Sequence, residues 1–148
     1  MKETSYSELS AEQKRLLDAA EKVMENSYSP YSRFSVGAAV LTETGEIVAA
    51  TNVENAVYHV VHAEVAAISK AVSMGHKKFK SMAVIAKGNG FDAKEVTGPC
   101  GECRQILFEL GGEGVEVVTS NTKKDKVLIA TIKDLLPYPF GPKTLEGK

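Results

Sequence analysis

Four residues of this 148-residue chain have the types and spacing needed to hold a metal ion and to use it. His62 and Glu64 are two residues apart at the predicted start of one helix, and Cys100 and Cys103 are three residues apart at the predicted start of another. On a first helical turn both sulfurs point to one face, and the positive end of the helix favours the thiolate form. One imidazole and two thiolates form a zinc ligand set that leaves a fourth position for water.

Glu64 is predicted to act beside this metal and not as one of its ligands. Its side chain leaves the helix start in a different direction from that of His62, two residues earlier. Zn²⁺ lowers the pKa of a bound water to about 7, and a neighbouring carboxylate can then carry the proton. The sequence therefore predicts metal-assisted hydrolysis, with Zn²⁺ as the cofactor.

Two other interpretations of the same residues remain open. A Cys-x-x-Cys pair alone is also typical of a redox dithiol of the thioredoxin kind. A structural zinc module that catalyses nothing would need four protein ligands. The candidates for that fourth ligand are His59 and Glu64, both of which would have to be stretched towards the metal.

The hydrophobic pattern predicts the elements that must position these residues. Ser10 and Gln13 form a capping box ahead of a helix over 11–26, and Gly45 favours a hairpin turn between two strands. A second helix, over 63–74, is apolar nearly all round and ends at Gly75. The remaining predicted elements are helices over 100–110 and 133–136 and strands over 34–42, 46–53, 81–87, 115–120 and 127–131. This order predicts one α/β domain over residues 1–148, with helices on both faces of a sheet.

Composition excludes several classes of protein. The chain has 18 Lys and Arg against 19 Asp and Glu, which argues against a nucleic-acid or membrane-surface partner. Uncharged stretches such as 34–42 are too short to span a bilayer, and the first residues contain no apolar core of a signal peptide. Two cysteines exclude a disulfide framework. We therefore expect a cytoplasmic protein.

The order of five motifs resembles the cytidine deaminase family, of the short, single-domain, homotetrameric type. His-x-Glu followed by Pro-Cys-x-x-Cys is an established signature of zinc-dependent nucleobase deaminases. The resemblance covers nearly the whole chain and implies a three-layer α/β/α fold with a mixed five-stranded sheet and a His-Cys-Cys zinc site. Its motifs are YSPYSRFSVGAA at 28–39, NVENA at 52–56, HAE at 62–64, PCGECRQ at 99–105 and LLPYPFGP at 135–142.

The resemblance also implies how a pyrimidine nucleoside would be bound. Asn52 and Glu54 would hydrogen-bond the ribose hydroxyls, and Phe34 would pack against the pyrimidine ring. The backbone around Ala63, together with Glu64, would recognise the polar edge of the base. From the residues alone, Asn52 and Glu54 fit equally the polar end of a hairpin strand, and Phe34 fits a plain core position.

Two further aromatic residues are implied to act between subunits. Tyr58 and Phe140 would approach the pocket from neighbouring subunits, so the resemblance implies an active site that needs the homotetramer. Without the resemblance, Tyr58 is equally a core residue and Phe140 a hydrophobic plug for the tail.

The chain departs from the pattern of the short deaminases at the metal motif. These usually carry Cys-Ala-Glu-Arg where this chain has His62-Ala63-Glu64-Val65. Three thiolates on Zn²⁺ leave the site at −1, which a nearby Arg offsets, whereas one His and two thiolates leave it neutral. Val65 is therefore consistent with His62. Arg104 is expected to donate a hydrogen bond to a cysteine sulfur, in a supporting role outside the ligand set.

The function implied is hydrolytic deamination of cytidine and deoxycytidine to uridine and deoxyuridine, with release of ammonia, in pyrimidine salvage. Glu64 would carry protons from water to ring N3 and then to the leaving amine. Val57 and His59 replace the family's usual small residues near the pocket. This difference leaves open a deaminase of N4-modified or antibiotic cytosine nucleosides, of the blasticidin type.

Overall fold

The computed structural model describes residues 1–146 and is organised around a mixed six-stranded sheet. The strands are arranged in the order β1-β8-β7-β6-β2-β3, and β6 and β7 form the parallel pair while the other neighbours are antiparallel. Their bounds are β1 Lys2–Thr4, β2 Phe34–Thr42, β3 Ile47–Thr51, β6 Phe79–Gly88, β7 Glu116–Ser120 and β8 Val127–Thr131.

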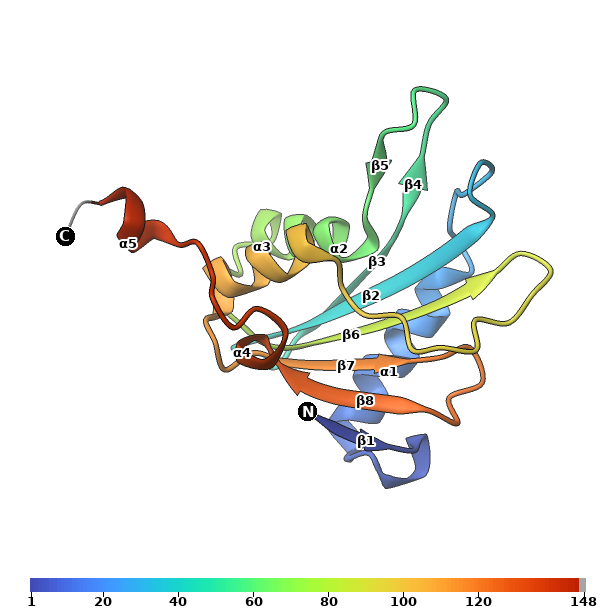
Figure 1. Cartoon of the computed structure of the whole chain (residues 1–148), viewed down its shortest axis with the longest axis horizontal. Helices are drawn as coiled ribbons and strands as arrows, with labels where there is room; N and C mark the ends of the chain where they lie inside the picture. The colour runs from blue at the N-terminus through green and yellow to red at the C-terminus, as the bar shows by residue number, and fades with distance from the viewer. Residues whose placement is uncertain (147–148) are drawn as a thin grey trace.

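Helices cover both faces of this sheet, so the predicted three-layer α/β/α fold is confirmed (Figure 1). Helix α1 (Ala11–Met24) packs on one face, and α2 (Ala63–Ser73) and α3 (Gly101–Gly111) lie on the other. Alternate residues of β2 and β6 point to the two cores. Those facing α2 and α3 are Ala38, Val40, Met82 and Val84, and those facing α1 are Ala39, Leu41, Ala83 and Ile85.

The sheet has one strand more than the five that were expected. All five predicted strands form, and β1 adds a sixth at the edge by pairing with β8, with Glu3 opposite Leu128. The α-amino group of Met1 lies 3.5 Å from Asp134 Oδ2 and helps to hold this end of the chain. The three residues Lys-Glu-Thr carry no strand periodicity of their own, and short charged segments are common at sheet edges.

Local signals account for most element boundaries. Ser10 accepts a hydrogen bond from the Gln13 backbone N–H and closes the predicted capping box of α1. Gly45 and Gly75 both have φ in the left-handed region, at +90° and +98°, where the hairpin turn and the end of α2 require it. A short helix η1 (Tyr6–Glu8) precedes α1, and α4 (Ile132–Leu135) and α5 (Pro142–Leu145) follow β8.

The strand predicted over 46–53 ends early, at Thr51, because of the side chain of Asn52. Asn52 Oδ1 accepts from the Val36 N–H at 2.9 Å and Nδ2 donates to the Phe34 carbonyl at 3.0 Å. In the next pair of the ladder the Asn52 N–H still donates to the Val36 carbonyl at 3.3 Å, but the Val36 N–H donates to the Asn52 side chain in place of its backbone carbonyl. The chain then leaves the sheet and forms a separate two-stranded hairpin, β4 (Val53–Glu54) and β5 (Val60–Val61).

This hairpin projects beyond the main sheet and leads directly into α2 (Figure 1). Val53 pairs with Val61, so Asn52 and His62 both lie at its base. Across the residues that the structure describes, no helix is both long and apolar enough to cross a bilayer.

Candidate metal centre

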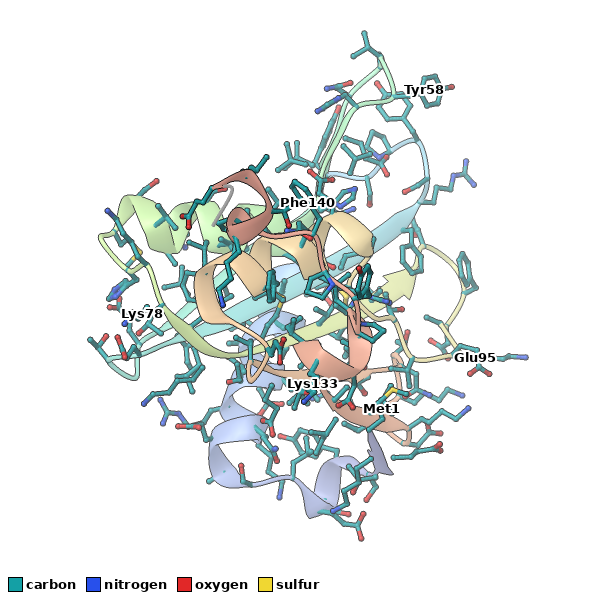
Figure 2. All side chains as sticks on the ribbon, turned by 60° about the vertical axis from the view of Figure 1, so that its left-hand side comes forward. Met1, Tyr58, Lys78, Glu95, Lys133 and Phe140 are labelled. Atoms are coloured by element: carbon teal, nitrogen blue, oxygen red, sulfur yellow. The ribbon has the colours of Figure 1, made fainter. Side chains whose placement is uncertain are left out.

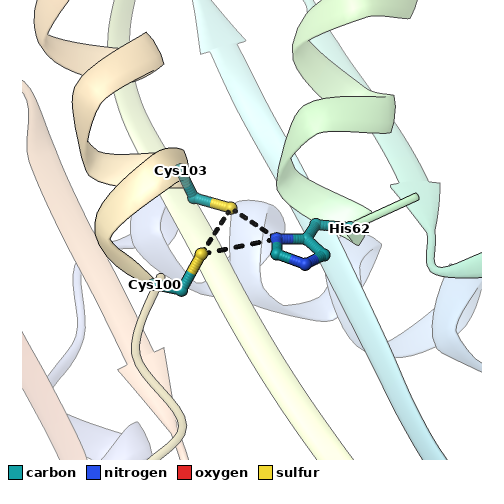
Figure 3. A group of neighbouring side chains, drawn as sticks. All are labelled: His62, Cys100 and Cys103. Atoms are coloured by element: carbon teal, nitrogen blue, oxygen red, sulfur yellow. Dashed lines mark hydrogen bonds between the residues drawn. The ribbon is translucent and has the colours of Figure 1, made fainter. Parts of the chain in front are cut away.

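His62, Cys100 and Cys103 come together at the ends of two neighbouring helices, as predicted (Figure 3). His62 Nδ1 lies 3.4 Å from each of the two sulfurs, and the sulfurs lie 3.5 Å apart. The two cysteines are not joined by a disulfide. Three donor atoms from segments 38 residues apart therefore form a compact triangle.

The size of this triangle suits zinc. Zn–S bonds of about 2.3 Å and Zn–N bonds of about 2.0–2.1 Å in a tetrahedron place donor atoms roughly 3.5–3.8 Å apart. The observed separations of 3.4–3.5 Å match that geometry with little adjustment. Within residues 1–146, the donor group that could hold a metal contains neither His59 nor Glu64, the two candidates for a fourth protein ligand.

The helix starts place these side chains. His62 is the N-cap of α2 and Cys100 is the N-cap of α3, both with extended backbone. Neither side chain accepts a hydrogen bond from its own helix, which is the usual task of a residue at this position. Cys103 follows one turn into α3 and is buried. Both N-cap side chains are thus free to point at the neighbouring helix.

The Glu64 carboxyl is buried against the same cluster. Only 6% of Glu64 is exposed, and its carboxyl lies beside the Cys103 thiol. Burial raises the pKa of Glu64 above its ordinary value, and its backbone N–H, His62 and Cys103 only partly offset the shift. A carboxyl with a raised pKa is suited to both accepting and releasing a proton near neutral pH.

Burial and the helix dipole act in opposite directions on the pKa of the Cys103 thiol. Desolvation raises the pKa of the Cys103 thiol far above its ordinary value, and the neighbouring Glu64 raises it further. For Cys103, burial therefore opposes the thiolate-favouring effect expected of the helix end. A bound cation supplies the missing positive charge, because a coordinating thiol is deprotonated outright.

Arg104 contacts backbone and not sulfur. Its Nε donates to the Pro99 carbonyl at 2.7 Å, and its Nη1 donates to the Leu135 carbonyl at 2.9 Å. In the described part of the chain, the expected hydrogen bond from Arg104 to a cysteine sulfur does not form. Arg104 instead ties the segment before Cys100 to the end of α4, because its planar guanidinium donates to one carbonyl from each segment.

Asn52 is buried and its amide is largely occupied by the protein itself. Oδ1 accepts from Val36 N and from the Ser27 hydroxyl at 2.7 Å, and one hydrogen of Nδ2 goes to Phe34 O. An amide nitrogen has two donor hydrogens, so one remains for another acceptor. The predicted role as a sugar ligand is therefore compatible with a single further hydrogen bond.

Glu54 lines a cavity of about 270 Å³ between the β4–β5 hairpin and the loop that precedes β2. Its carboxylate accepts from the backbone N–H groups of Tyr31 and Ser32 at 3.0 and 3.1 Å, and from the Ser32 hydroxyl. The Ser32 hydroxyl lowers the pKa of Glu54 below its ordinary value, and the two N–H groups act in the same direction against burial. Glu54 is thus a buried carboxylate held in its ionised form.

The other predicted contact residues differ in how far they are exposed to solvent. Phe34 is half-buried at the start of β2, and Ala63 is buried as the first residue of α2. Tyr58 is 85% exposed at the tip of the hairpin, where its ring centroid lies 6.0 Å from that of Tyr31. Phe140 is 56% exposed, and its carbonyl accepts from Gln105 on α3. Figure 2 shows Tyr58 and Phe140 well apart within one chain.

Comparison with known proteins decides the relationship. The family described as cytidine and deoxycytidylate deaminase zinc-binding region matches residues 10–119. The chain belongs to the cytidine and deoxycytidylate deaminase family. Membership of this zinc-binding family, together with the geometry of the donor triangle, makes Zn²⁺ the metal of the site.

Two relatives and one solved structure match this chain over most of their length. A cytidine deaminase of Sporosarcina psychrophila is 39% identical over 132 residues, covering 88% of this chain and 93% of the relative. A probable cytidine deaminase of Dictyostelium discoideum is 39% identical, and the match covers 93% of this chain and 89% of that relative. The crystal structure of cytidine deaminase from Burkholderia pseudomallei has a TM-score of 0.77, at 38% identity, covering 85% of this chain and 97% of that one.

Sequence reasoning missed Ser32 and Tyr31, which both line the cavity beside Glu54. Both belong to the segment 28–39 that carries the resemblance to the deaminase family, and only Arg33 separates them from Phe34. Their place in that segment could have suggested a role. Their contacts with Glu54, which is 23 residues from Tyr31 and 22 from Ser32, could not be inferred from that segment.

Proposed function

We propose that residues 1–148 form one domain that catalyses hydrolytic deamination of cytidine and deoxycytidine to uridine and deoxyuridine, with release of ammonia. The observation that carries this proposal is the buried Glu64 carboxyl beside a zinc-sized triangle of His62, Cys100 and Cys103. The names of two relatives, cytidine deaminases at 39% and 38% identity, support the substrate.

His62, Cys100 and Cys103 would hold Zn²⁺ through three protein ligands. The metal supplies a water molecule whose pKa is lowered to about 7, which makes a nucleophile available at neutral pH. Both N-cap side chains point between the helices and the third ligand is buried, so the donor atoms need little reorganisation.

Glu64 is the proposed catalytic proton carrier. It takes a proton from the attacking water and delivers it to ring N3, which makes C4 electrophilic and lets the water oxygen add there. Glu64 then takes the remaining proton from the new C4 hydroxyl and passes it to the exocyclic amine, so that the C4 carbonyl forms as the C4–N bond breaks and ammonia leaves. Burial and a raised pKa suit this exchange, because the carboxyl must hold the proton and release it within one turnover.

The nucleoside would be held by residues from both sides of the hairpin base. Asn52 would donate its remaining Nδ2 hydrogen and Glu54 its remaining acceptor position to the ribose hydroxyls. Phe34 would pack against the pyrimidine, and the first turn of α2 at Ala63 would offer N–H groups to the polar edge of the base. Arg104 would act indirectly, by holding the Pro99 carbonyl and with it the start of α3.

We further propose that the protein works as a homotetramer in the cytoplasm, in pyrimidine salvage. Tyr58 and Phe140 expose large aromatic surfaces and lie apart in one chain. Neighbouring subunits could bring both rings to one pocket, and subunit contact would remove them from water. Sedimentation would reveal the tetramer, and a monomer with full activity would contradict it.

The experiment that tests the function pairs zinc analysis with ammonia release from cytidine and deoxycytidine. We expect close to one zinc per chain and formation of uridine and deoxyuridine. The same assay with N4-substituted cytidines tests the antibiotic-type alternative, for which the relevant residues Val57 and His59 lie exposed on the hairpin. Full zinc content without turnover of any of these nucleosides would instead indicate a structural zinc module.

A further inference from the structure

Ser32 connects the two segments that are proposed to hold the nucleoside. Its backbone N–H donates to Glu54 Oε2 at 3.1 Å, and its hydroxyl donates to Glu54 Oε1. The same hydroxyl oxygen accepts from the Phe34 backbone N–H at 3.0 Å. One side chain thus links the carboxylate on β4 to the first residue of β2.

These contacts leave Glu54 with little free capacity. A carboxylate offers about four acceptor positions on its two oxygens. Oε2 accepts from Tyr31 N and Ser32 N, and Oε1 accepts from the Ser32 hydroxyl. About one position is left, on Oε1, which is enough for one hydroxyl of a ligand in the cavity that both residues line.

The turn that carries Ser32 is held at both ends. Arg33 has a φ of +57°, and its N–H donates to the Ser29 carbonyl at 3.0 Å. The Arg33 carbonyl accepts from the Asn89 N–H at 2.7 Å. A non-glycine residue stays in the left-handed region only where its surroundings determine the backbone, so the backbone that carries Ser32 is set by contacts within the chain.

We propose that Ser32 is a positioning residue for nucleoside binding, whose hydroxyl sets the direction of the free acceptor of Glu54 and the place of Phe34. The inference rests on the proposed function and deepens it, because it assigns recognition of one sugar hydroxyl to a pair of residues. Ser32 is exposed to solvent, whereas only 6% of Glu54 is exposed. The Ser32 hydroxyl therefore serves as a hydrogen-bond donor to a buried carboxylate and not as a packing group.

The test compares Ser32→Ala with the control variant Ser29→Ala, which removes a different hydroxyl from the same turn. The Ser29 hydroxyl contacts Ser27 and Ser35 but neither Glu54 nor Phe34. For Ser32→Ala we expect KM for cytidine to rise about tenfold, in line with loss of a hydrogen bond to a charged group, while kcat changes far less. Ser32→Thr keeps the hydroxyl and should restore most of the affinity, and Ser29→Ala should resemble the wild type.

A second substrate separates positioning from a general loosening of the turn. Wild-type protein should bind 2′,3′-dideoxycytidine more weakly than cytidine, and this difference should shrink in Ser32→Ala. Ser32→Ala should also add little to the effect of Glu54→Ala, because both changes remove the hydrogen bond between the Ser32 hydroxyl and the Glu54 carboxylate. An unchanged KM in Ser32→Ala, or equal losses in Ser29→Ala and Ser32→Ala, would overturn the inference.

Binding of uridine, measured by calorimetry, keeps this test independent of turnover. We expect Ser32→Ala to weaken uridine binding by a similar factor, with a melting temperature close to that of the wild type. Absence of deamination in the wild type would contradict the proposed function alone. Equal uridine affinity of the wild type and Ser32→Ala would contradict the role of Ser32 alone.

Discussion

Nδ1 of His62 and Sγ of Cys100 lie 3.4 Å apart, and each belongs to the residue that begins a different helix. An N-cap side chain normally accepts a hydrogen bond from an N–H of its own first turn, and such a cap stabilises a protein by about 0.5–2 kcal/mol. Neither His62 nor Cys100 does so. Both N-cap side chains serve the metal centre, and the local stability of α2 and α3 is reduced in consequence.

Cys100→Ser should therefore have opposite effects on metal binding and on metal-free stability. Serine is a weaker zinc ligand than the thiolate, so zinc content and activity should fall sharply. The backbone at position 100 is already extended, as at a capped helix start, so serine should raise the metal-free free energy of unfolding by about 1 kcal/mol. Urea unfolding in the presence of a chelator measures the difference.

Cys103→Ser provides the matched control for that measurement. It removes the other thiolate, but position 103 lies inside α3, is buried, and offers no capping geometry. Cys103→Ser should lose zinc in the same way and gain no metal-free stability. Equal stability changes in the two variants would show that the N-cap argument is wrong.

Glu64→Gln should separate proton transfer from metal binding. Glutamine keeps the shape of the buried side chain but cannot carry a proton, so kcat should fall by about 10²–10⁴-fold while zinc content stays at the wild-type level. Glu102→Gln is the control, since this exposed carboxylate lies 3.9 Å from His62 Nδ1 and has no proposed part in the reaction. Its kcat should remain near that of the wild type.

Glu54 should stay ionised at a pH where an ordinary glutamate is already protonated. The Ser32 hydroxyl and two backbone N–H groups lower the pKa of Glu54 in the folded protein. The ionised Glu54 therefore stabilises the fold at any pH above the ordinary glutamate pKa. This stabilisation is lost as the pH falls through the lower pKa of the folded state. Side-chain NMR titration should show a lowered pKa that rises in Ser32→Ala, and equal values in the two proteins would contradict the argument.

Gly37→Ala should destabilise the whole fold. A Cβ at this position of β2 would collide with the Ala20 carbonyl oxygen of α1 and approach Met24 Cβ to 2.9 Å. Overpacking of this kind costs about 1–3 kcal/mol, which urea unfolding detects as a lower midpoint. Gly114→Ala is the control, because a Cβ there meets nothing within 4 Å. A midpoint for Gly37→Ala equal to that of Gly114→Ala would mean that α1 can move away from the sheet at little cost.

Local patterns were sufficient for the elements that have their own start and stop signals. The capping box at Ser10, the turn at Gly45 and the end of α2 at Gly75 are each short-range hydrogen-bond or backbone effects, and all three form as expected. The edge strand β1 was missed because its pairing with β8 joins the two ends of the chain. The early end of β3 was missed because it depends on which backbone groups the Asn52 side chain reaches.

The sequence alone determined the metal donors and the family resemblance, because residue types and their spacing along two helix starts already specify which atoms can bind zinc. Which groups surround those atoms depends on how the chain folds. In the folded chain Glu64 is buried against Cys103, Arg104 donates hydrogen bonds to two backbone carbonyls, and the Ser32 hydroxyl donates to Glu54. Burial and hydrogen-bond partners arise from segments far apart in the chain, so pKa values and side-chain directions follow from packing and not from spacing.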